Sequence, residues 1–489
     1  MTMLNYKKAY IWFAIASLAY LFPIIKADRY FIDDYNRAIL GYLSWSDNGR
    51  PLADIVMSVI NFGTTISDIS PLTQVLGIAS LSAILAFILR KNTLSPVQAV
   101  LCSMCVIASP FMMETLSYAY DSLPMLLSIA LIFISFLLTP KNNYVAFAWH
   151  LICVISSLCL YQASLGIYVV LALLNYIEKE NKNFKGLLTL LSNALAFILS
   201  YLIYSRLIAP NFISGGYSTK RSEMISLTSD DAFHAIVINI EKYISFAKLG
   251  YPKPFFVVCA LLFAVGFCGL MIRARDFYCS RMRASSIAMV ITLLSPFVIA
   301  FMAIVPLSIL AFPPIMSRVL TVVGAGTMFM MYYSFRSASG ARYVISACIA
   351  ALFFCYSYST IYAYGNAQTR QKDFETYAIG LMQNDISLYA EKNIFDLYGG
   401  VPASPVSALI ISQHPIMAWT VLSNVTFRDE WRTNIALQNY RFQSTYKQGS
   451  FEGDIKSPPC SNMIKGYNGM YSLFKKNGVL LFYFKDICK

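Results

Sequence analysis

Long apolar runs constrain this chain more than any other feature of its sequence. One crossing of a bilayer needs roughly 20 mostly apolar residues in a helix. The 489 residues are 57% hydrophobic and only 13% charged, which is far from the balance of a soluble domain. We therefore predict a polytopic α-helical membrane protein with about eleven transmembrane helices. The predicted spans are 9–25, 71–89, 94–112, 122–139, 144–160, 163–177, 187–205, 254–272, 285–306, 318–335 and 342–362.

Basic residues indicate which side of the membrane each loop occupies. Cytoplasmic loops are enriched in Lys and Arg, and most basic residues here lie in short loops between spans. If the N-terminus is cytoplasmic, one side carries Lys7 and Lys8, Arg90 and Lys91, Lys141, the stretches 179–185 and 273–283, and Arg336 with Arg342. The net charge of +13 is thus explained by orientation, and we expect no nucleic-acid binding.

The opposite, outer side receives most of the acidic and polar segments. Its long loops are 26–70 and 206–254. Helical periodicity predicts two amphipathic segments, 33–45 and 52–62, that lie along the membrane interface. A further helix is predicted over 231–248, within a loop long enough to indicate a functional role.

After about residue 362 the chain becomes too polar to cross a membrane. We therefore divide it into a transmembrane domain, 1–362, and a small outer α/β domain, 363–489. The second domain is expected to begin with a helix over 366–392 and to contain strands at 406–412 and 478–485. Two cysteines of this polar region, Cys460 and Cys488, are expected to pair if the compartment is oxidising.

An acidic pair follows the first span. Asp33 or Asp34 can supply the general base that a sugar or phosphate transfer reaction needs. The alternative is a solvated loop or a helix cap, since Asp favours that position. Nearby cations favour the catalytic interpretation, because they can hold a phosphate while one carboxylate accepts a proton. These cations are Arg29, Arg37 and Arg50. Adjacent helical side chains point about 100° apart, so at most one carboxylate is the base, with Asp33 slightly favoured.

Other outer boundaries carry weaker candidates. Glu114 and Asp121 flank the second outer loop, where capping explains an acidic residue about as well as function does. Arg318 begins a span, where it binds a lipid phosphate or extends to the headgroups. The remaining substrate-binding candidates are Tyr161, Gln162, Lys220 and Arg221. No zinc-type spacing, Gly-rich phosphate loop or dinucleotide fingerprint occurs, so we predict neither a metal site nor a cytosolic nucleotide donor.

With these residues in place, the chain resembles the Gtr-type O-antigen glucosyl transferases, the serotype-converting enzymes of temperate phages and bacterial prophages. The opening motif that carries the resemblance is Phe31-Ile-Asp-Asp-Tyr-Asn-Arg37, followed by Gly41, Trp45, Gly49-Arg-Pro-Leu52 and Asp68-Ile-Ser-Pro71. Weaker landmarks are Tyr161 with Gln162 and the boundary from Pro314 to Arg318. The resemblance covers the membrane region and, more loosely, the chain from Asn366 onward.

The resemblance implies a GT-C-like enzyme of the bacterial inner membrane with a periplasmic C-terminal domain. Such an enzyme transfers glucose from undecaprenyl phosphate-glucose to a sugar of the lipopolysaccharide O-antigen. The implied mechanism is a single inverting displacement, with Asp33 or Asp34 as the base, arginines stabilising the leaving phosphate, and no required cofactor or metal.

Three alternatives stay open. Another polyprenyl-phosphate-sugar transferase or an O-antigen polymerase would use a similar donor. A lipid or sugar transporter or flippase, from a different class, would also fit a bundle of this size. The outer position of most acidic residues favours an interfacial enzyme over a transporter, whose charged sites lie near the bilayer midplane.

Overall fold

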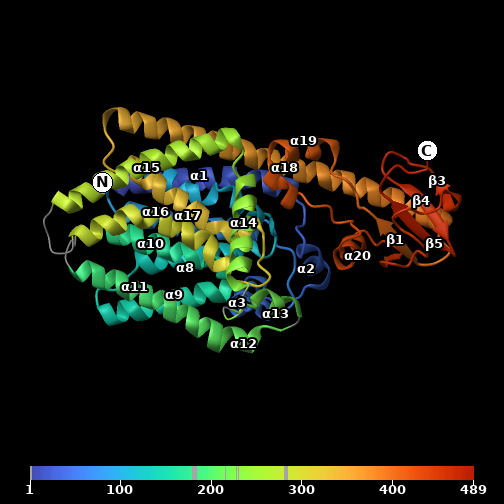
Figure 1. Ribbon diagram of the computed structural model, residues 1–489, viewed down its shortest axis with the longest axis horizontal. Coiled ribbons are helices and arrows are strands. Elements are labelled where there is room, and N and C mark those ends of the chain that lie inside the picture. The colour runs from blue at the N-terminus through green and yellow to red at the C-terminus, as the bar shows by residue number, and fades with distance from the viewer. Residues whose placement is uncertain are drawn as a thin grey trace. The chain divides into compact units, whose positions relative to one another are not determined.

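The computed structural model describes residues 3–178, 184–214, 216–226, 228, 231–279 and 285–488. Parts of the basic stretches predicted at 179–185 and 273–283 therefore lie outside the described residues. The chain is mostly helical and divides into two compact units (Figure 1). Unit 1 comprises Met1–Phe22 and Tyr42–Tyr362, and unit 2 comprises Pro23–Gly41 and Ala363–Lys489.

Unit 1 is a bundle of apolar helices. Its α-helices are α1 (Met3–Ala27, which ends in unit 2), α3 (Pro51–Asn61), α4 (Leu72–Ser80), α5 (Ser82–Arg90), α6 (Pro96–Ile107), α7 (Met113–Ser117), α8 (Ser122–Leu137), α9 (Asn143–Leu160), α10 (Leu165–Glu178), α11 (Phe184–Ile203), α12 (Ala209–Phe212), α13 (Gly216–Ser222), α14 (Ala232–Leu249), α15 (Lys253–Cys279), α16 (Ser285–Ser308) and α17 (Thr321–Phe335). Short helical turns connect them at η1 (Ser46–Asn48), η2 (Pro110–Met112), η3 (Gln162–Ser164), the π-helical η4 (Tyr204–Ile208) and η5 (Ser317–Leu320).

The apolar helices make the chain a multi-pass membrane protein. Among the described residues, seven helices are long and apolar enough to cross a bilayer, or eight if one bent pair counts as a single span. That pair joins Pro96–Ile107 to Pro110–Ser117 with a bend of 50°. Each of the eleven predicted spans contains helix, but several helices are shorter than a full crossing. The count of eleven crossings therefore stays a prediction.

Close packing in the bundle positions α17, whose preceding turn η5 carries Arg318. Helix α17 contacts α6 and α15 extensively. A Cβ atom at Gly266 of α15 would lie only 2.6 Å from the carbonyl oxygen of Met330. Small residues at such contacts allow the backbones of membrane helices to approach each other. Gly266 therefore allows α15 to pack closely against α17, the helix that follows Arg318.

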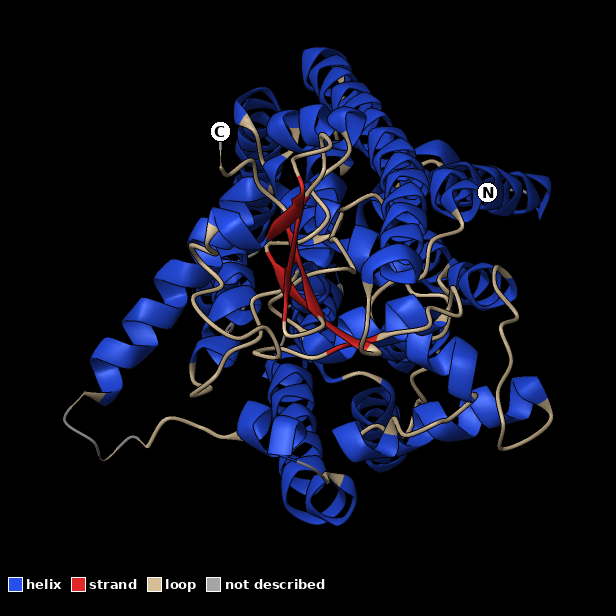
Figure 2. Ribbon diagram, turned by 90° about the vertical axis from the view of Figure 1, so that its right-hand side faces the viewer, coloured by secondary structure: helices blue, strands red, loops and turns tan. Residues whose placement is uncertain are grey.

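Unit 2 contains one sheet, shown in red in Figure 2. Its strands are β1 (Ile394–Tyr398), β2 (Thr445–Tyr446), β3 (Met463–Lys465), β4 (Ser472–Lys476) and β5 (Val479–Tyr483), in the order β2-β1-β5-β4-β3. Strand β1 is parallel to β2 and β5, whereas β4 is antiparallel to β3 and β5. The helices of this unit are α2 (Asp34–Leu40), the end of α18 (Gly340–Tyr389), α19 (Pro405–Gln413), η6 (Pro415–Trp419), α20 (Glu430–Gln438) and η7 (Cys460–Asn462).

The core of unit 2 lies between the sheet and the last turns of α18. Ala378, Ile379 and Met382 of α18 are buried against Leu397 and Phe482 of the sheet. Burial of such side chains is the main favourable term for folding of a small domain. The C-terminal end of α18 therefore supports the sheet of unit 2.

Several predicted elements are confirmed. The helix over 231–248 is α14, the amphipathic segment 52–62 is α3, and the strand at 478–485 is β5. The segment 33–45 forms a shorter helix, α2, because Gly41 adopts a left-handed conformation with φ of 63° and ends it.

Two elements of the C-terminal region differ from the sequence predictions. The strand predicted at 406–412 is wrong, since this segment is helix α19. The Ser404 hydroxyl accepts a hydrogen bond from the Ser407 amide at 3.2 Å, and Pro405 occupies the first turn. This cap chemistry starts a helix despite the β-branched residues that follow. The helix predicted over 366–392 is not separate, because α18 continues from the last apolar span without a break.

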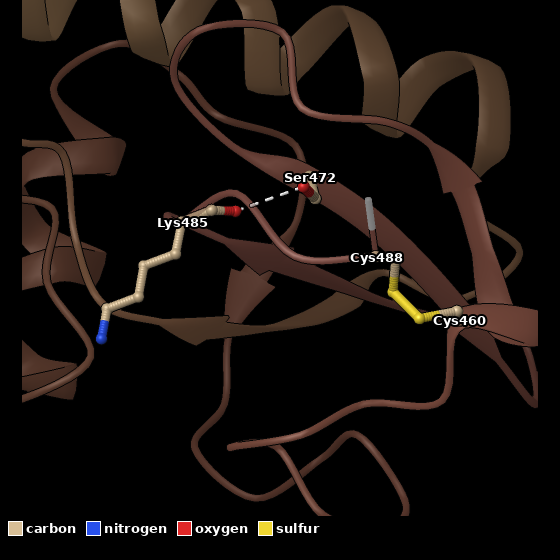
Figure 3. Close-up of a disulfide and its surroundings, with 4 residues drawn as sticks. All are labelled: Cys460, Ser472, Lys485 and Cys488. Atoms are coloured by element: carbon tan, nitrogen blue, oxygen red, sulfur yellow. Dashed lines mark hydrogen bonds between the residues drawn. A yellow bond between two sulfur atoms is a disulfide. The ribbon is translucent and has the colours of Figure 1, made fainter.

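A disulfide joins Cys460 to Cys488 across 28 residues of unit 2 (Figure 3). Nearby, the Ser472 hydroxyl donates a hydrogen bond of 3.2 Å to the Lys485 carbonyl oxygen. Replacing both cysteines by Ser is expected to lower the free energy of unfolding of unit 2 by about 3–4 kcal/mol, because the unfolded loop regains its freedom. Thermal unfolding of the purified full chain measures the change. Cys279→Ser, at an exposed thiol of α15, is the control. Equal melting temperatures for the disulfide variant and this control would contradict the prediction.

Candidate active site

The acidic pair lies at the start of α2 in unit 2. Asp33 is half-buried at the N-cap position, although its side chain makes no capping hydrogen bond. Asp34 is fully buried, and its carboxylate accepts a hydrogen bond from the Phe31 amide at 3.0 Å. The Asp34 amide donates to the Phe31 carbonyl oxygen at 3.1 Å. These two bonds close a turn in which Ile32 has a φ of 44°, a costly conformation for a β-branched residue. Asp34 therefore holds the turn, and Asp33 has the more accessible carboxylate.

Arg29 anchors the acidic motif to α18. Its Nη2 atom lies 2.8 Å from Oε2 of Glu375, and both side chains are 4% exposed. The guanidinium also donates to the Gln368 side chain and to the Leu422 carbonyl oxygen. These contacts within unit 2 give Arg29 a structural role, and its role as a phosphate ligand stays a prediction. Arg37 is also buried, one turn after Asp33.

Glu375 extends this anchor to a loop and to α2. Its Oε1 atom accepts a hydrogen bond from the Asn424 amide at 2.8 Å. The Asn424 side chain donates to the Tyr35 hydroxyl at 3.4 Å. Burial raises the pKa of Tyr35, and the negative charge of Glu375 raises it further. The segment 23–41 thus rests on residues of the C-terminal region, a relation that no sequence pattern indicated.

A second cluster of charged side chains lies in unit 1. Arg50 and Asp121 occupy the N-cap positions of α3 and α8. Arg50 Nη1 lies 3.9 Å from Oδ2 of Asp121, which is buried. The Trp45 indole N–H donates a hydrogen bond to Oδ1 of the same carboxylate. Trp45 itself is held because its amide donates to Asp54 at 2.8 Å. The opening motif includes Trp45, but the sequence did not indicate its contact with Asp121, nor any role for Asp54.

Glu114 and Arg318 form the other ion pair of this cluster. Arg318 Nε lies 3.5 Å from Oε1 of Glu114, and the Arg318 amide donates to Oε2 at 3.0 Å. The Arg318 guanidinium lies over the Tyr118 ring, 4.9 Å from its centroid. Tyr161 connects the two pairs, because its hydroxyl donates to the Arg318 carbonyl oxygen at 3.3 Å and its ring lies 5.7 Å from the Arg50 guanidinium. Burial raises the pKa of Tyr161 to about 12, so the phenol stays protonated.

Gln162 supports the turn that precedes Arg50. Its side-chain amide donates to the Asn48 carbonyl oxygen at 3.0 Å and to the Tyr204 hydroxyl at 2.7 Å. Tyr204 in turn donates to the Gly49 carbonyl oxygen at 2.7 Å. Gly49 has a φ of 73°, and a Cβ there would lie 2.5 Å from the Tyr204 oxygen. This turn needs glycine, and Gln162 supports it through these two hydrogen bonds.

Lys220 and Arg221 lie on α13. Arg221 donates to the carbonyl oxygens of Phe312 and Pro313 at 3.1 and 3.3 Å. Lys220 is exposed. These bonds, together with an Ala311 amide that donates to the Glu223 carbonyl oxygen at 2.9 Å, hold the loop 206–254 against the segment before Arg318. Arg221 therefore orders this loop.

Unsatisfied polar atoms surround the two ion pairs of unit 1. Within the described part of the chain, the hydroxyls of Thr115, Ser122 and Ser317 are buried without a hydrogen-bond partner. Each is adjacent in sequence to Glu114, Asp121 or Arg318. A buried polar group without a partner costs about 1–3 kcal/mol. Ordered water or substrate hydroxyls would satisfy such groups.

The acidic motif and the two ion pairs of unit 1 fall within a segment shared with known proteins. The family model described as glucosyl transferase GtrII matches residues 22–335. A protein of Salmonella phage P22, described as an uncharacterized 55.3 kDa protein in the gtrB 5′ region, is 29% identical over 445 residues. That match covers 88% of this chain and 90% of the phage protein. No solved structure matches the chain.

The family match confirms the resemblance drawn from the opening motif. The matched segment includes the acidic pair, both ion pairs of unit 1 and most of the apolar helices. It covers well over half of the chain, and the phage relative extends the similarity into the C-terminal region. The chain therefore belongs to the GtrII glucosyl transferase family of membrane proteins.

Proposed function

We propose that the protein transfers glucose from undecaprenyl phosphate-glucose to a sugar of the lipopolysaccharide O-antigen. The reaction takes place at the periplasmic face of the bacterial inner membrane. Membership of the GtrII glucosyl transferase family carries the proposal. The apolar helices support a lipid-linked donor, because a polyprenyl chain stays in the bilayer.

Asp33 acts as the general base in this proposal. Its half-buried carboxylate accepts the proton of an acceptor hydroxyl, and the oxygen attacks the anomeric carbon of glucose. The bond to the donor phosphate breaks in the same displacement, so the anomeric configuration inverts. Asp34 acts as a positioning residue, since its carboxylate closes the turn that precedes α2.

The phosphate leaves as an anion and needs positive charge as the bond breaks. For Arg50 and Arg318 of unit 1, the role of phosphate ligand stays a prediction from the sequence. Their guanidinium groups lie 3.9 and 3.5 Å from the carboxylates of Asp121 and Glu114, within ion-pair distance. Preorganised donors stabilise developing charge without reorganising during the reaction.

A donor panel tests the proposal. Purified protein in proteoliposomes is given O-antigen acceptor with undecaprenyl phosphate-glucose, the corresponding mannose lipid, or UDP-glucose. Transfer is expected from the lipid-linked glucose alone. Transfer from UDP-glucose would contradict the lipid-linked donor, and preference for the mannose lipid would contradict the sugar assignment.

A further inference from the structure

Helix α20 places an arginine beside the helix that carries the acidic motif. Helices α20 and α2 contact each other, and both belong to unit 2. Arg432 lies in the first turn of α20, where its amide donates to the Asp429 side chain at 3.0 Å. Its own side chain is 17% exposed. The C-terminal region therefore brings a mostly buried cation to the element that begins at Asp34.

The guanidinium of Arg432 has unused hydrogen-bonding capacity. Its ion-pair partner is Asp429, with Nε and Oδ2 4.0 Å apart, and the Asp429 side chain is 43% exposed. The Nε atom is buried and has no hydrogen-bond partner among the residues that the structure describes. Burial lowers the pKa of Arg432, and the positive charge of Arg29 also lowers it. Arginine nevertheless stays protonated at neutral pH.

Other cations of unit 2 are engaged in different contacts. Arg29 is paired with Glu375 at 2.8 Å. Lys372 is paired with Asp28 at 3.1 Å and is partly exposed. Arg428 is exposed, with its guanidinium 5.9 Å from the centroid of the Phe427 ring. The Nε atom of Arg29 is also buried without a hydrogen-bond partner among the described residues, but its carboxylate partner lies at 2.8 Å, whereas that of Arg432 lies at 4.0 Å. Arg432 differs from Lys372 and Arg428 because its side chain is more buried.

The electrostatic surroundings connect Arg432 to the anchor of the acidic motif. The charges of Glu375 and Arg29 both act on its guanidinium. Those two residues neutralise each other in their ion pair, and Asp429 lies at the outer limit of ion-pair distance. A mostly buried cation with so little compensation favours an additional anion. A phosphate matches the planar fork of guanidinium donors.

We propose that Arg432 binds the phosphate of the lipid-linked donor beside the acidic motif. This inference rests on the proposed function. The guanidinium holds the phosphate before transfer and receives its negative charge as the glycosyl bond breaks. The C-terminal region thereby contributes a ligand to the reaction.

Binding and kinetics with the full chain test this inference. Purified protein in nanodiscs is titrated with undecaprenyl phosphate, and with inorganic phosphate in a separate arm, while tryptophan fluorescence is recorded. Trp431 is 48% exposed next to Arg432 and serves as a reporter. Arg432→Gln is expected to weaken undecaprenyl phosphate binding and raise the donor KM about tenfold or more, as for loss of a charged hydrogen bond. The acceptor KM is expected to stay unchanged.

Two further variants separate binding from folding. Arg432→Lys is expected to restore part of the affinity because it keeps the charge. Arg428→Gln, at an exposed arginine in the same segment, is expected to leave binding unchanged. Tighter binding of undecaprenyl phosphate than of inorganic phosphate would identify the lipid headgroup as the ligand, whereas equal binding would identify phosphate alone.

Two results would overturn the inference. One is undecaprenyl phosphate binding by Arg432→Gln that matches the unsubstituted protein. The other is an equal loss of binding in Arg432→Gln and Arg428→Gln. If the protein transfers no glucose but Arg432→Gln still weakens undecaprenyl phosphate binding, the phosphate site stands and the proposed function fails.

Discussion

Asp33→Asn is expected to reduce glucosyl transfer by about 10²–10⁴-fold, the range for loss of a general base. The amide is nearly the same size as the carboxylate but cannot accept the proton of the acceptor hydroxyl. The variant is expected to reach the membrane in normal amount, since the substitution preserves the size and shape of the side chain. Initial rates with lipid-linked glucose and O-antigen measure the effect.

Asp34→Asn is the matched control for that substitution. Its side-chain oxygen can still accept the Phe31 amide, so the turn before α2 is preserved. We expect transfer to fall much less than in Asp33→Asn. A larger loss of transfer in Asp34→Asn than in Asp33→Asn would mean that Asp34 is the base and Asp33 the positioning residue. Full activity in both variants would mean that neither aspartate takes part in the reaction.

Glu375→Ala is expected to lower the free energy of unfolding by about 3–5 kcal/mol, because it leaves a buried arginine without its counterion. Arg29 and Glu375 are each only 4% exposed, so water does not replace the lost partner. Transfer is also expected to fall, since the anchor of the acidic motif is lost. Unfolding of the purified protein by denaturant measures the stability, and the transfer assay measures the activity.

The same helix offers a control for this ion pair. Arg370 and Asp373 lie 3.7 Å apart on α18 with side chains 63% and 61% exposed. Asp373→Ala is expected to change stability by less than about 1 kcal/mol, as for exposed ion pairs. Replacing Arg29 and Glu375 together by Met is expected to recover part of the loss, because no buried charge remains. Equal destabilisation by Glu375→Ala and Asp373→Ala would contradict the anchoring role of the ion pair between Arg29 and Glu375.

The apolar spans and the clearest local patterns could be predicted from the sequence. Hydropathy located helix in every predicted span because a bilayer demands satisfied backbone hydrogen bonds along each crossing. Periodicity located α14 and β5. The strand predicted at 406–412 failed because the cap at Ser404 starts a helix there. Helix lengths were less predictable, since a bend such as that after α6 has no strong signal in hydropathy.

The sequence could not reveal which residues far apart in the chain lie together in the structure. Arg29 and Glu375 are 346 residues apart, and no periodicity relates them. The association of 23–41 with the C-terminal region follows from such contacts, so the acidic motif belongs to unit 2 in the structure.

In the candidate site too, local patterns selected residues, but their contacts with distant residues could not be predicted. Ionisable residues at predicted outer boundaries meet in unit 1, including Arg50, Asp121 and Arg318. Tyr118 and the contact of Trp45 with Asp121 were missed, because aromatic residues are frequent at membrane boundaries and give no distinguishing signal. Arg221 was selected for its charge, yet its guanidinium donates to backbone carbonyl oxygens.

The central claim is that this protein adds glucose to O-antigen. The most direct measurement is mass spectrometry with linkage analysis of O-antigen from cells that carry the gene, its Asp33→Asn variant or no copy, with the lipid-linked glucose supply intact. We expect one added glucose at a single linkage with the unmodified gene and almost none with Asp33→Asn. O-antigen of identical mass in all three strains, with the protein present in the membrane, would contradict the proposed activity.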